Sequence, residues 1–215
     1  MSGTTGLRRF REPPAARSAD TGPPDGERSA EEHCEMCGAV LAATHGHVVN
    51  VEVRGLMCAC RPCYLLFTQE GAARGRFRTV PDRYLYDASF TLTDEQWERL
   101  QIPVGIAFFF RNSALDRFAA FYPSPGGATE SLLPADTWNE ILTANPGVPE
   151  VAPDVEALLL RRRDDRVECH LVPIDACYDL VGRVRLHWRG FAGGTEVWQE
   201  IEDFFARLEE RSRRP

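Results

Sequence analysis

The chain has 215 residues, 43% of them hydrophobic, which suits one domain of ordinary size together with a small module and a tail. Its formal net charge is −7 and its isoelectric point is about 5.3. This charge excludes a nucleic-acid-binding surface over the whole chain, because phosphate binding needs a basic surface, although it leaves room for a local basic patch. No run of about 18 apolar residues occurs, so the sequence predicts no membrane span.

The N-terminal segment, residues 1–31, is rich in proline, glycine, serine and charge. It has too few large apolar residues to offset the entropy lost on ordering, so we predict a disordered tail. It also lacks the apolar stretch of a secretory signal, which favours a cytoplasmic protein. Thiols stay reduced in the cytoplasm, where closely spaced cysteines are metal ligands more often than disulfides.

Residues 32–70 form a predicted cysteine module. Two knuckles, "CEMCG" at 34–38 and "CACRPC" at 58–63, flank the alternating stretch "HVVNVEVRGLMC" at 47–58. This β-branched stretch predicts a short hairpin with its turn at "RG". Two cysteine pairs separated by a hairpin are typical of zinc-ribbon and treble-clef modules.

The two knuckles hold five cysteines, one more than a four-thiolate site needs. Cys34, Cys37, Cys60 and Cys63 form two matched C-x-x-C pairs with 22 residues between them. A two-residue spacer lets both sulfurs of a pair face one ion, so we predict a metal site at these four residues. Cys58 is a possible substitute for Cys60; otherwise it is a small buried residue at a strand end.

Four thiolates suit zinc or a single iron, and they leave no open position for water or substrate. We therefore expect a structural zinc, with iron as the alternative. Rubredoxins hold iron between two knuckles of the C-x-x-C-G kind, but here Tyr64 follows the second knuckle. His33, His45 and His47 are further candidate ligands, interpreted as ordinary surface or turn histidines because four thiolates already saturate the ion.

Residues 71–92 are interpreted as a connector, because glycine, proline and arginine recur along them. An α+β domain is expected at residues 93–211. It begins with a short helix that ends before Pro103. Thr93 is the expected N-cap of this helix and Gln96 follows three residues later, which is the spacing of a capping box.

The rest of this domain predicts the order ββαββαα and a largely antiparallel sheet. A nearly continuous apolar run at its start is typical of a central strand. The expected elements are strands at 102–112 and 116–127, a helix at 134–145, two strands within 153–175 joined at Asp164 and Asp165, and helices at 176–188 and from about Thr195. The apolar residues of the last helix recur at helical spacing: Val197, Ile201, Phe204, Phe205 and Leu208.

No catalytic constellation is found in this domain. G-x-S-x-G, H-E-x-x-H and a usable Ser/His/Asp set are all absent from the sequence. Cys169 and His170 are strand neighbours that point to opposite faces, and Cys169 and Cys177 are interpreted as core cysteines. "YPSPGGATES" at 122–131 lacks the lysine and spacing of a P-loop, so we interpret it as a strand-to-helix turn. We therefore expect no enzymatic activity.

Seven stretches together resemble a bacterial family of unknown function, and the resemblance covers almost the whole chain. These are "RRFREPP", "HCEMCG", "LMCACRPCYLLF", "RFRTVPDRY", "IPVGIAFFFRNS", "FYPSPGGATES" and "VPIDACYDLVGRVRLHWRGFAGGTEVWQEIEDFF". The family is associated with gene clusters of high-affinity [NiFe] uptake hydrogenases. The resemblance therefore implies a role in assembling or serving that enzyme, with a hydrogenase subunit or maturation factor as partner.

Three functional hypotheses remain open. In the first, the chain is a non-catalytic accessory protein whose zinc module and α+β domain bind a protein partner. In the second, iron in the same site makes it a one-electron carrier. In the third, Cys58 is a redox-active thiol next to the metal, since a thiolate near a cation is activated.

Overall fold

The computed structural model describes residues 31–69, 71–163 and 166–213. Nearly all of the tail predicted at 1–31 lies outside these residues, and so does the turn at Asp164 and Asp165. The named strands of the described part pair antiparallel, in a three-stranded and a six-stranded sheet. The predicted α+β class with a largely antiparallel sheet is confirmed.

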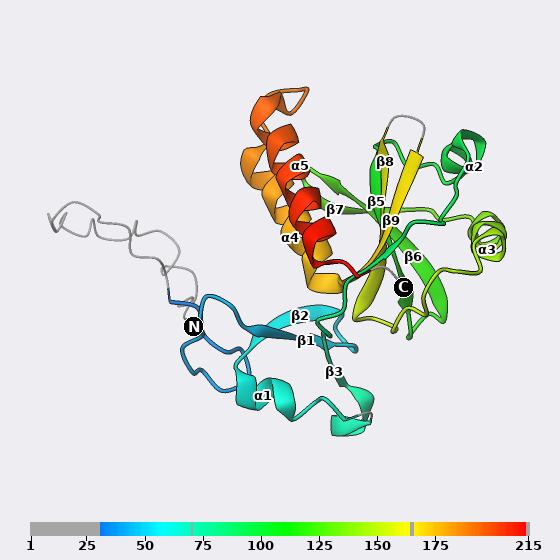
Figure 1. Cartoon of the computed structure of the whole chain (residues 1–215). Helices are drawn as coiled ribbons and strands as arrows, with labels where there is room; N and C mark the ends of the chain where they lie inside the picture. Colours follow the sequence, from blue (N-terminus) through cyan, green and yellow to red (C-terminus); the bar gives the residue numbers. More distant parts are fainter. Residues whose placement is uncertain (1–30, 70, 164–165, 214–215) are drawn as a thin grey trace, which may run out of the picture. The chain divides into compact units, whose positions relative to one another are not determined.

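The smaller sheet has the strand order β2-β1-β3 (Figure 1). Its elements are β1 (Gly46–Asn50), β2 (Gly55–Ala59) and β3 (Phe77–Thr79), with helix α1 (Arg61–Leu65) and the 3-10 helix η2 (Ala72–Gly75) between β2 and β3. The predicted hairpin is thus present as β1 and β2. The Asn50 side chain closes its loop by accepting hydrogen bonds from the amides of Glu52 (3.2 Å) and Val53 (3.5 Å).

The larger sheet has the order β4-β9-β8-β5-β6-β7. Its strands are β4 (Leu85–Asp87), β5 (Ile106–Asn112), β6 (Arg117–Ser124), β7 (Gly127–Ser131), β8 (Glu156–Arg163) and β9 (Arg166–Pro173). The apolar run at 102–112 supplies β5, which lies between β8 and β6 as expected of a central strand.

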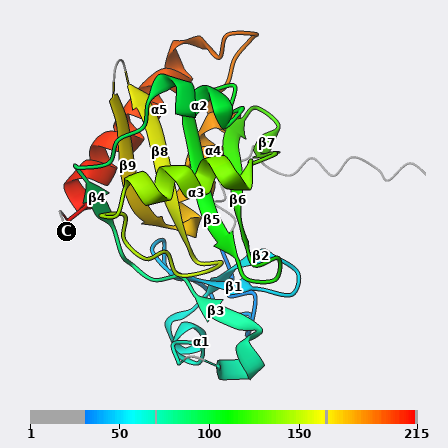
Figure 2. The ribbon, with the colours of Figure 1, turned by 90° about the vertical axis from the view of Figure 1, so that its right-hand side faces the viewer.

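Helices cover both faces of this sheet (Figures 1 and 2). They are α2 (Asp94–Arg99), α3 (Ala135–Ala144), α4 (Ile174–His187) and α5 (Gly194–Arg211). Phe108 and Leu159 pack in the core under α4 and α5, whereas Phe109 and Leu158 pack under α2 and α3. Burial on both faces explains why β5 and β8 are apolar without alternation.

Two predicted helix details are confirmed. The hydroxyl of Thr93 accepts a hydrogen bond from the amide of Gln96, and the Gln96 side chain accepts one from the amide of Thr93, which completes the capping box. The buried residues of α5 are the predicted set: Val197, Ile201, Phe204, Phe205 and Leu208.

The prediction of a strand-to-helix turn at 122–131 is wrong. This segment is a β-hairpin, in which β6 pairs with β7 from Ala120 with Ser131 to Ser124 with Gly127. The Ser124 hydroxyl accepts a hydrogen bond from the amide of Gly126 (3.2 Å) and donates one to the carbonyl of Gly127 (2.9 Å). The small and polar residues of β7 carry no apolar alternation, so the sequence pattern did not reveal a strand.

The segment 71–92, expected as a connector, supplies one strand to each sheet. β3 pairs with β1, and β4 pairs with β9. Between these strands Arg83 donates from Nε and Nη2 to the two carboxylate oxygens of Glu156, at 2.7 and 2.6 Å. Glu156 is buried on β8, so this bidentate ion pair fixes the connection against the larger sheet.

Candidate metal centre

The first knuckle, Cys34 and Cys37, lies on a tight turn before β1. The amide of Gly38 donates to the carbonyl of Cys34, and the amide of Cys34 donates to the carbonyl of Ala39, both at 2.8 Å. Gly38 has a φ of 75°, which glycine adopts without the strain a side chain would cause. Glycine after the second cysteine therefore suits the reversal that brings the two cysteines together.

The second knuckle, Cys60 and Cys63, lies where β2 passes into α1. Cys60 is the N-cap residue of α1, and its carbonyl accepts a hydrogen bond from the amide of Tyr64 at 2.9 Å. Glu35 connects the two knuckles: its amide donates to the carbonyl of Cys58 at 3.0 Å, and its carboxylate accepts from the amide of Cys58 at 2.6 Å. These bonds hold the first knuckle against the end of β2.

The sulfur atoms of Cys34, Cys37, Cys60 and Cys63 all lie within 4.8 Å of one another. The Cys37 and Cys60 sulfurs are 3.6 Å apart. A tetrahedral ion with metal–sulfur bonds of about 2.3 Å separates its sulfur ligands by about 3.8 Å. The four predicted residues are therefore placed close enough to hold one metal ion.

The electrostatics of this cluster also favour a cation. Burial raises the pKa of the Cys34 thiol, but backbone hydrogen bonds from Cys60, Met36 and Cys37 lower it, and the pKa falls to about 6. Hydrogen bonds with the thiols of Cys60 and Cys37 raise the pKa of Cys63 to about 12. Cys34 therefore ionises easily, whereas Cys63 beside it does not ionise at neutral pH. A bound cation would stabilise both thiolates.

Cys58 is not a member of this cluster. Its sulfur and one ring nitrogen each of His45 and His47 form a second group, whose atoms lie within 4.8 Å of one another. Burial raises the pKa of Cys58, and the carboxylates of Glu35 and Glu32 raise it further. The structure thus brings together two histidines and the cysteine that the sequence pattern had left unassigned.

The register of the hairpin explains this second group. His47 on β1 is directly opposite Cys58 on β2, and directly opposed residues of an antiparallel pair share one face of the sheet. His45 directly precedes β1, and its ring centroid lies 5.0 Å from that of His47. The sequence signal of this group is "HGH" at 45–47, which lies opposite the end of the second strand. It can be recognised only when the pairing of His47 with Cys58 is known.

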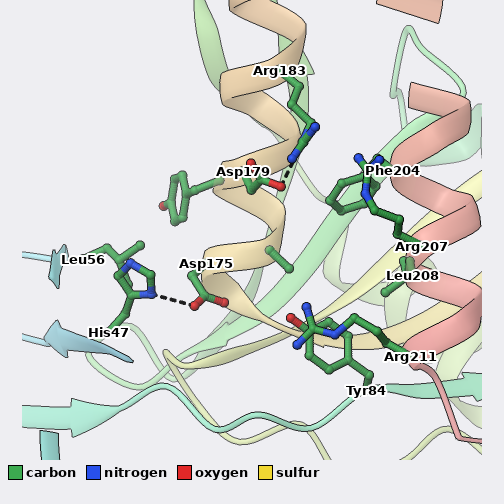
Figure 3. A pocket seen from close by; sticks show the side chains of 12 residues that line it. His47, Leu56, Tyr84, Asp175, Asp179, Arg183, Phe204, Arg207, Leu208 and Arg211 are labelled. Carbon is green, nitrogen blue, oxygen red and sulfur yellow. Dashed lines mark hydrogen bonds and ion pairs between the residues drawn. The ribbon is translucent and has the colours of Figure 1, made fainter. Parts of the chain in front are cut away.

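His47 also lines a cleft between the smaller sheet and the helices α4 and α5 (Figure 3). Its Nδ1 is 2.8 Å from the Asp175 carboxylate, in the first turn of α4. Arg183, Arg207 and Arg211 line the same cleft of about 530 Å³. Arg183 pairs with Asp179 at 3.0 Å, so the cleft contains charges of both signs.

The two remaining cysteines lie in the apolar cores of the larger sheet. Cys169 packs in the core under α2 and α3, and Cys177 packs in the core under α4 and α5. Burial raises the pKa of both thiols. His170 packs near Phe205 on the α5 side, so Cys169 and His170 face opposite sides of β9 as predicted.

A family model described as "Family of unknown function (DUF5947)" matches residues 33–212. The chain belongs to this family. No curated protein and no solved structure matches the chain. The matched region of this DUF5947 protein contains both cysteine knuckles, the second group and both sheets. Within the part of the chain that the structure describes, no helix is long and apolar enough to cross a membrane.

Proposed function

We propose that the chain is a non-catalytic, zinc-binding accessory protein. Cys34, Cys37, Cys60 and Cys63 hold the zinc as four thiolates. The observation that carries this proposal is the mutual approach of their sulfurs to within 4.8 Å. Four protein ligands leave no position for water or substrate, so the ion is structural. It fixes the two knuckles to each other and thereby the shape of the N-terminal module.

A protein partner is supported by exposed apolar residues where α4 is connected to α5. Phe191 is fully exposed, and Leu186 and Trp198 are 69% and 54% exposed; we call these three residues the α4–α5 turn patch. Exposed aromatic residues of this kind are enriched at protein interfaces. The net charge of −7 argues against nucleic acid as the partner.

The identity of the partner rests on the family resemblance. We infer a hydrogenase subunit or a maturation factor of a [NiFe] hydrogenase, bound in the cytoplasm during assembly or function. The test is co-elution of the purified full chain with a co-expressed hydrogenase subunit or maturation factor on size exclusion. Phe191→Asp should abolish co-elution, whereas Leu132→Asp, a change of a leucine that is 88% exposed and lies outside the patch, should preserve it. A complex that survives Phe191→Asp contradicts the patch as the docking surface.

The metal is tested by elemental analysis and absorption spectroscopy of anaerobically purified protein. We expect a colourless protein that contains zinc, with the zinc of this site lost from Cys37→Ser and Cys63→Ser and retained in Cys58→Ser. A folded, colourless protein that contains no zinc contradicts the proposal.

The second candidate function is a one-electron carrier with iron in the same four-thiolate shell, which the sulfur geometry fits equally well. It predicts a red protein with thiolate-to-iron absorption. Anaerobic protein without colour and without iron eliminates it.

A further inference from the structure

His45, His47 and Cys58 remain to be explained once the four-cysteine cluster is assigned. His47 and Cys58 are opposite each other in the β1–β2 hairpin, and His45 directly precedes β1. The Cys58 sulfur and one ring nitrogen of each histidine lie within 4.8 Å of one another. The ring centroids of the two histidines are 5.0 Å apart. Imidazole nitrogen and thiolate sulfur are the usual ligands of zinc and related divalent transition ions.

The hydrogen bonds of His45 fix which of its nitrogens is free. Nδ1 lies 3.0 Å from the carbonyl of Ala42, which only accepts, so Nδ1 carries the proton. The Glu32 carboxylate, 3.7 Å from the same nitrogen, favours that tautomer too. In the neutral ring Nε2 then carries a lone pair, and this atom is buried without a hydrogen-bond partner among the described residues. A buried lone pair without a partner costs free energy unless something binds it.

His47 is oriented in the same way by a carboxylate. Its Nδ1 donates to Asp175 Oδ2 at 2.8 Å, which leaves Nε2 with a lone pair (Figure 3). A histidine that binds a metal through one nitrogen usually donates its other N–H to a carbonyl or a carboxylate. Both histidines of this group already have that second interaction, His45 with a carbonyl and His47 with a carboxylate.

We propose that Cys58 Sγ, His45 Nε2 and His47 Nε2 form a second metal site for a divalent transition ion such as zinc. Ligand bonds of about 2.0–2.3 Å require separations of about 3.3–3.6 Å between the three ligand atoms. The Cys58 sulfur and one ring nitrogen of each histidine already lie within 4.8 Å of one another, so the bound ion would draw the three side chains together. Asp175 and the Ala42 carbonyl are its positioning groups. The four-cysteine site uses none of these side chains, so the two sites are separate.

This second site differs from the first in having only three protein ligands. A zinc site with three protein ligands keeps its fourth position for water or an exchangeable ligand. His45 and His47 line a cleft of about 600 Å³, together with Arg61 and Arg211. Asp82 and Asp175 line the same cleft, and Arg211 already pairs with Asp82 at 2.9 Å. The ion and Arg61 therefore make a small anion, such as a carboxylate, the class of ligand that suits this position.

The first test is metal stoichiometry of the full chain after dialysis against zinc. We expect two zinc ions per chain in the wild type and in Cys177→Ser, a buried cysteine outside both sites. We expect one in Cys58→Ser and in His47→Gln. Wild-type protein with a single zinc that Cys58→Ser retains overturns the second site but not the four-cysteine site. If the wild type binds a single zinc that is lost from Cys58→Ser but retained in Cys37→Ser, the four-cysteine site is overturned and the second site is supported.

The second test does not depend on how a Cys58 variant folds. Alkylation of zinc-loaded protein, mapped by mass spectrometry, should modify Cys58 at least tenfold faster in His47→Gln than in the wild type. The four knuckle cysteines should stay protected in both proteins, which shows that the module remains folded around its first ion. Equal alkylation of Cys58 in both proteins, with the knuckle cysteines protected, overturns the proposal.

The open position is tested with cobalt as a spectroscopic substitute for zinc. Addition of azide to the cobalt-loaded wild type should change the visible absorption of one of two bound ions. Cobalt-loaded Cys58→Ser, which keeps only the four-thiolate ion, should not respond. A wild-type spectrum that azide leaves unchanged contradicts an exchangeable fourth ligand.

Discussion

The six-stranded sheet and the three-stranded sheet are both antiparallel, but they bury very different amounts of apolar surface. The larger sheet carries an apolar core on each face, with Phe108 under α4 and α5 and Phe109 under α2 and α3. Among the described residues, the fully buried large side chains all belong to the larger sheet and the segments packed on it. The smaller sheet contributes Val48, Val49 and Ala59, and Val49 packs in the core under α4 and α5. A region with so small a core needs another source of stability, and the metal that we propose between the knuckles would supply it.

The comparison is sharpened most by removal of the metal. In zinc fingers metal binding contributes roughly 10–16 kcal/mol at neutral pH, and this free energy is coupled to folding. Chelation, or the change Cys37→Ser, should therefore abolish amide-exchange protection across the knuckles and the β1–β2 hairpin. The larger sheet should keep its protection. Full protection of the hairpin in metal-free protein would show that the smaller sheet is stable by itself.

A cavity in the core under α2 and α3 should have the next largest effect. Trp138 is buried and stacks on Phe109, with ring centroids 4.1 Å apart. Trp138→Ala should lower the free energy of unfolding by about 3–5 kcal/mol, because it removes contacts from a close-packed core. Trp198 is exposed, so Trp198→Ala should change the free energy of unfolding by less than about 0.5 kcal/mol, as measured by denaturant titration. Similar losses in the two variants would contradict the assignment of the core.

Acid should destabilise the fold through His170 on β9 of the larger sheet. Burial and, to a smaller extent, the positive charge of Arg161 together lower the pKa of His170 to about 4. The unfolded chain then binds more protons, so this contribution to stability is full above pH 6.5 and is lost as the pH falls toward 4. Between pH 7 and pH 5 the wild type should lose about 2 kcal/mol more than His170→Gln in denaturant titrations. Parallel pH profiles would refute this.

Two glycine substitutions should change stability in opposite directions, and the one in α4 should have the smaller effect. A Cβ at Gly46 on β1 would lie 2.6 Å from the ring of Tyr64, whereas a Cβ at Gly182 within α4 meets nothing within 4 Å. Gly46→Ala should cost about 1–3 kcal/mol by overpacking. Gly182→Ala should instead stabilise by about 0.5–1 kcal/mol, because alanine is the better helix former. Thermal unfolding distinguishes the two, and a neutral Gly46→Ala would show that the Tyr64 ring moves aside freely.

Features encoded in short, regular patterns could be predicted from the sequence. The apolar spacing of α5, the capping box at Thr93 and the two C-x-x-C pairs each depend on residues within a turn or two of one another. β3 and β4 were not predicted, because strands of three residues are too short to show alternation and depend on partners elsewhere in the chain.

The second group was beyond the sequence pattern for a related reason. The alignment of His47 with Cys58 is set by the pairing register, and Asp175 is 128 residues away from His47. A shift of one residue would place Cys58 on the other face of the sheet. The histidines were interpreted as surface residues because the four thiolates satisfied one ion, and nothing in the linear pattern indicated a second.

The hydrogen bond between His47 and Asp175 joins the small sheet to the first turn of α4, whose other end carries the α4–α5 turn patch. If binding at the patch displaces α4, it changes the position of Asp175 and hence the affinity of the second site for its ion. Thermodynamic linkage then requires the ion to change the affinity for the partner by the same factor. Through one carboxylate, the chain would bind its partner with an affinity that reports whether metal is present.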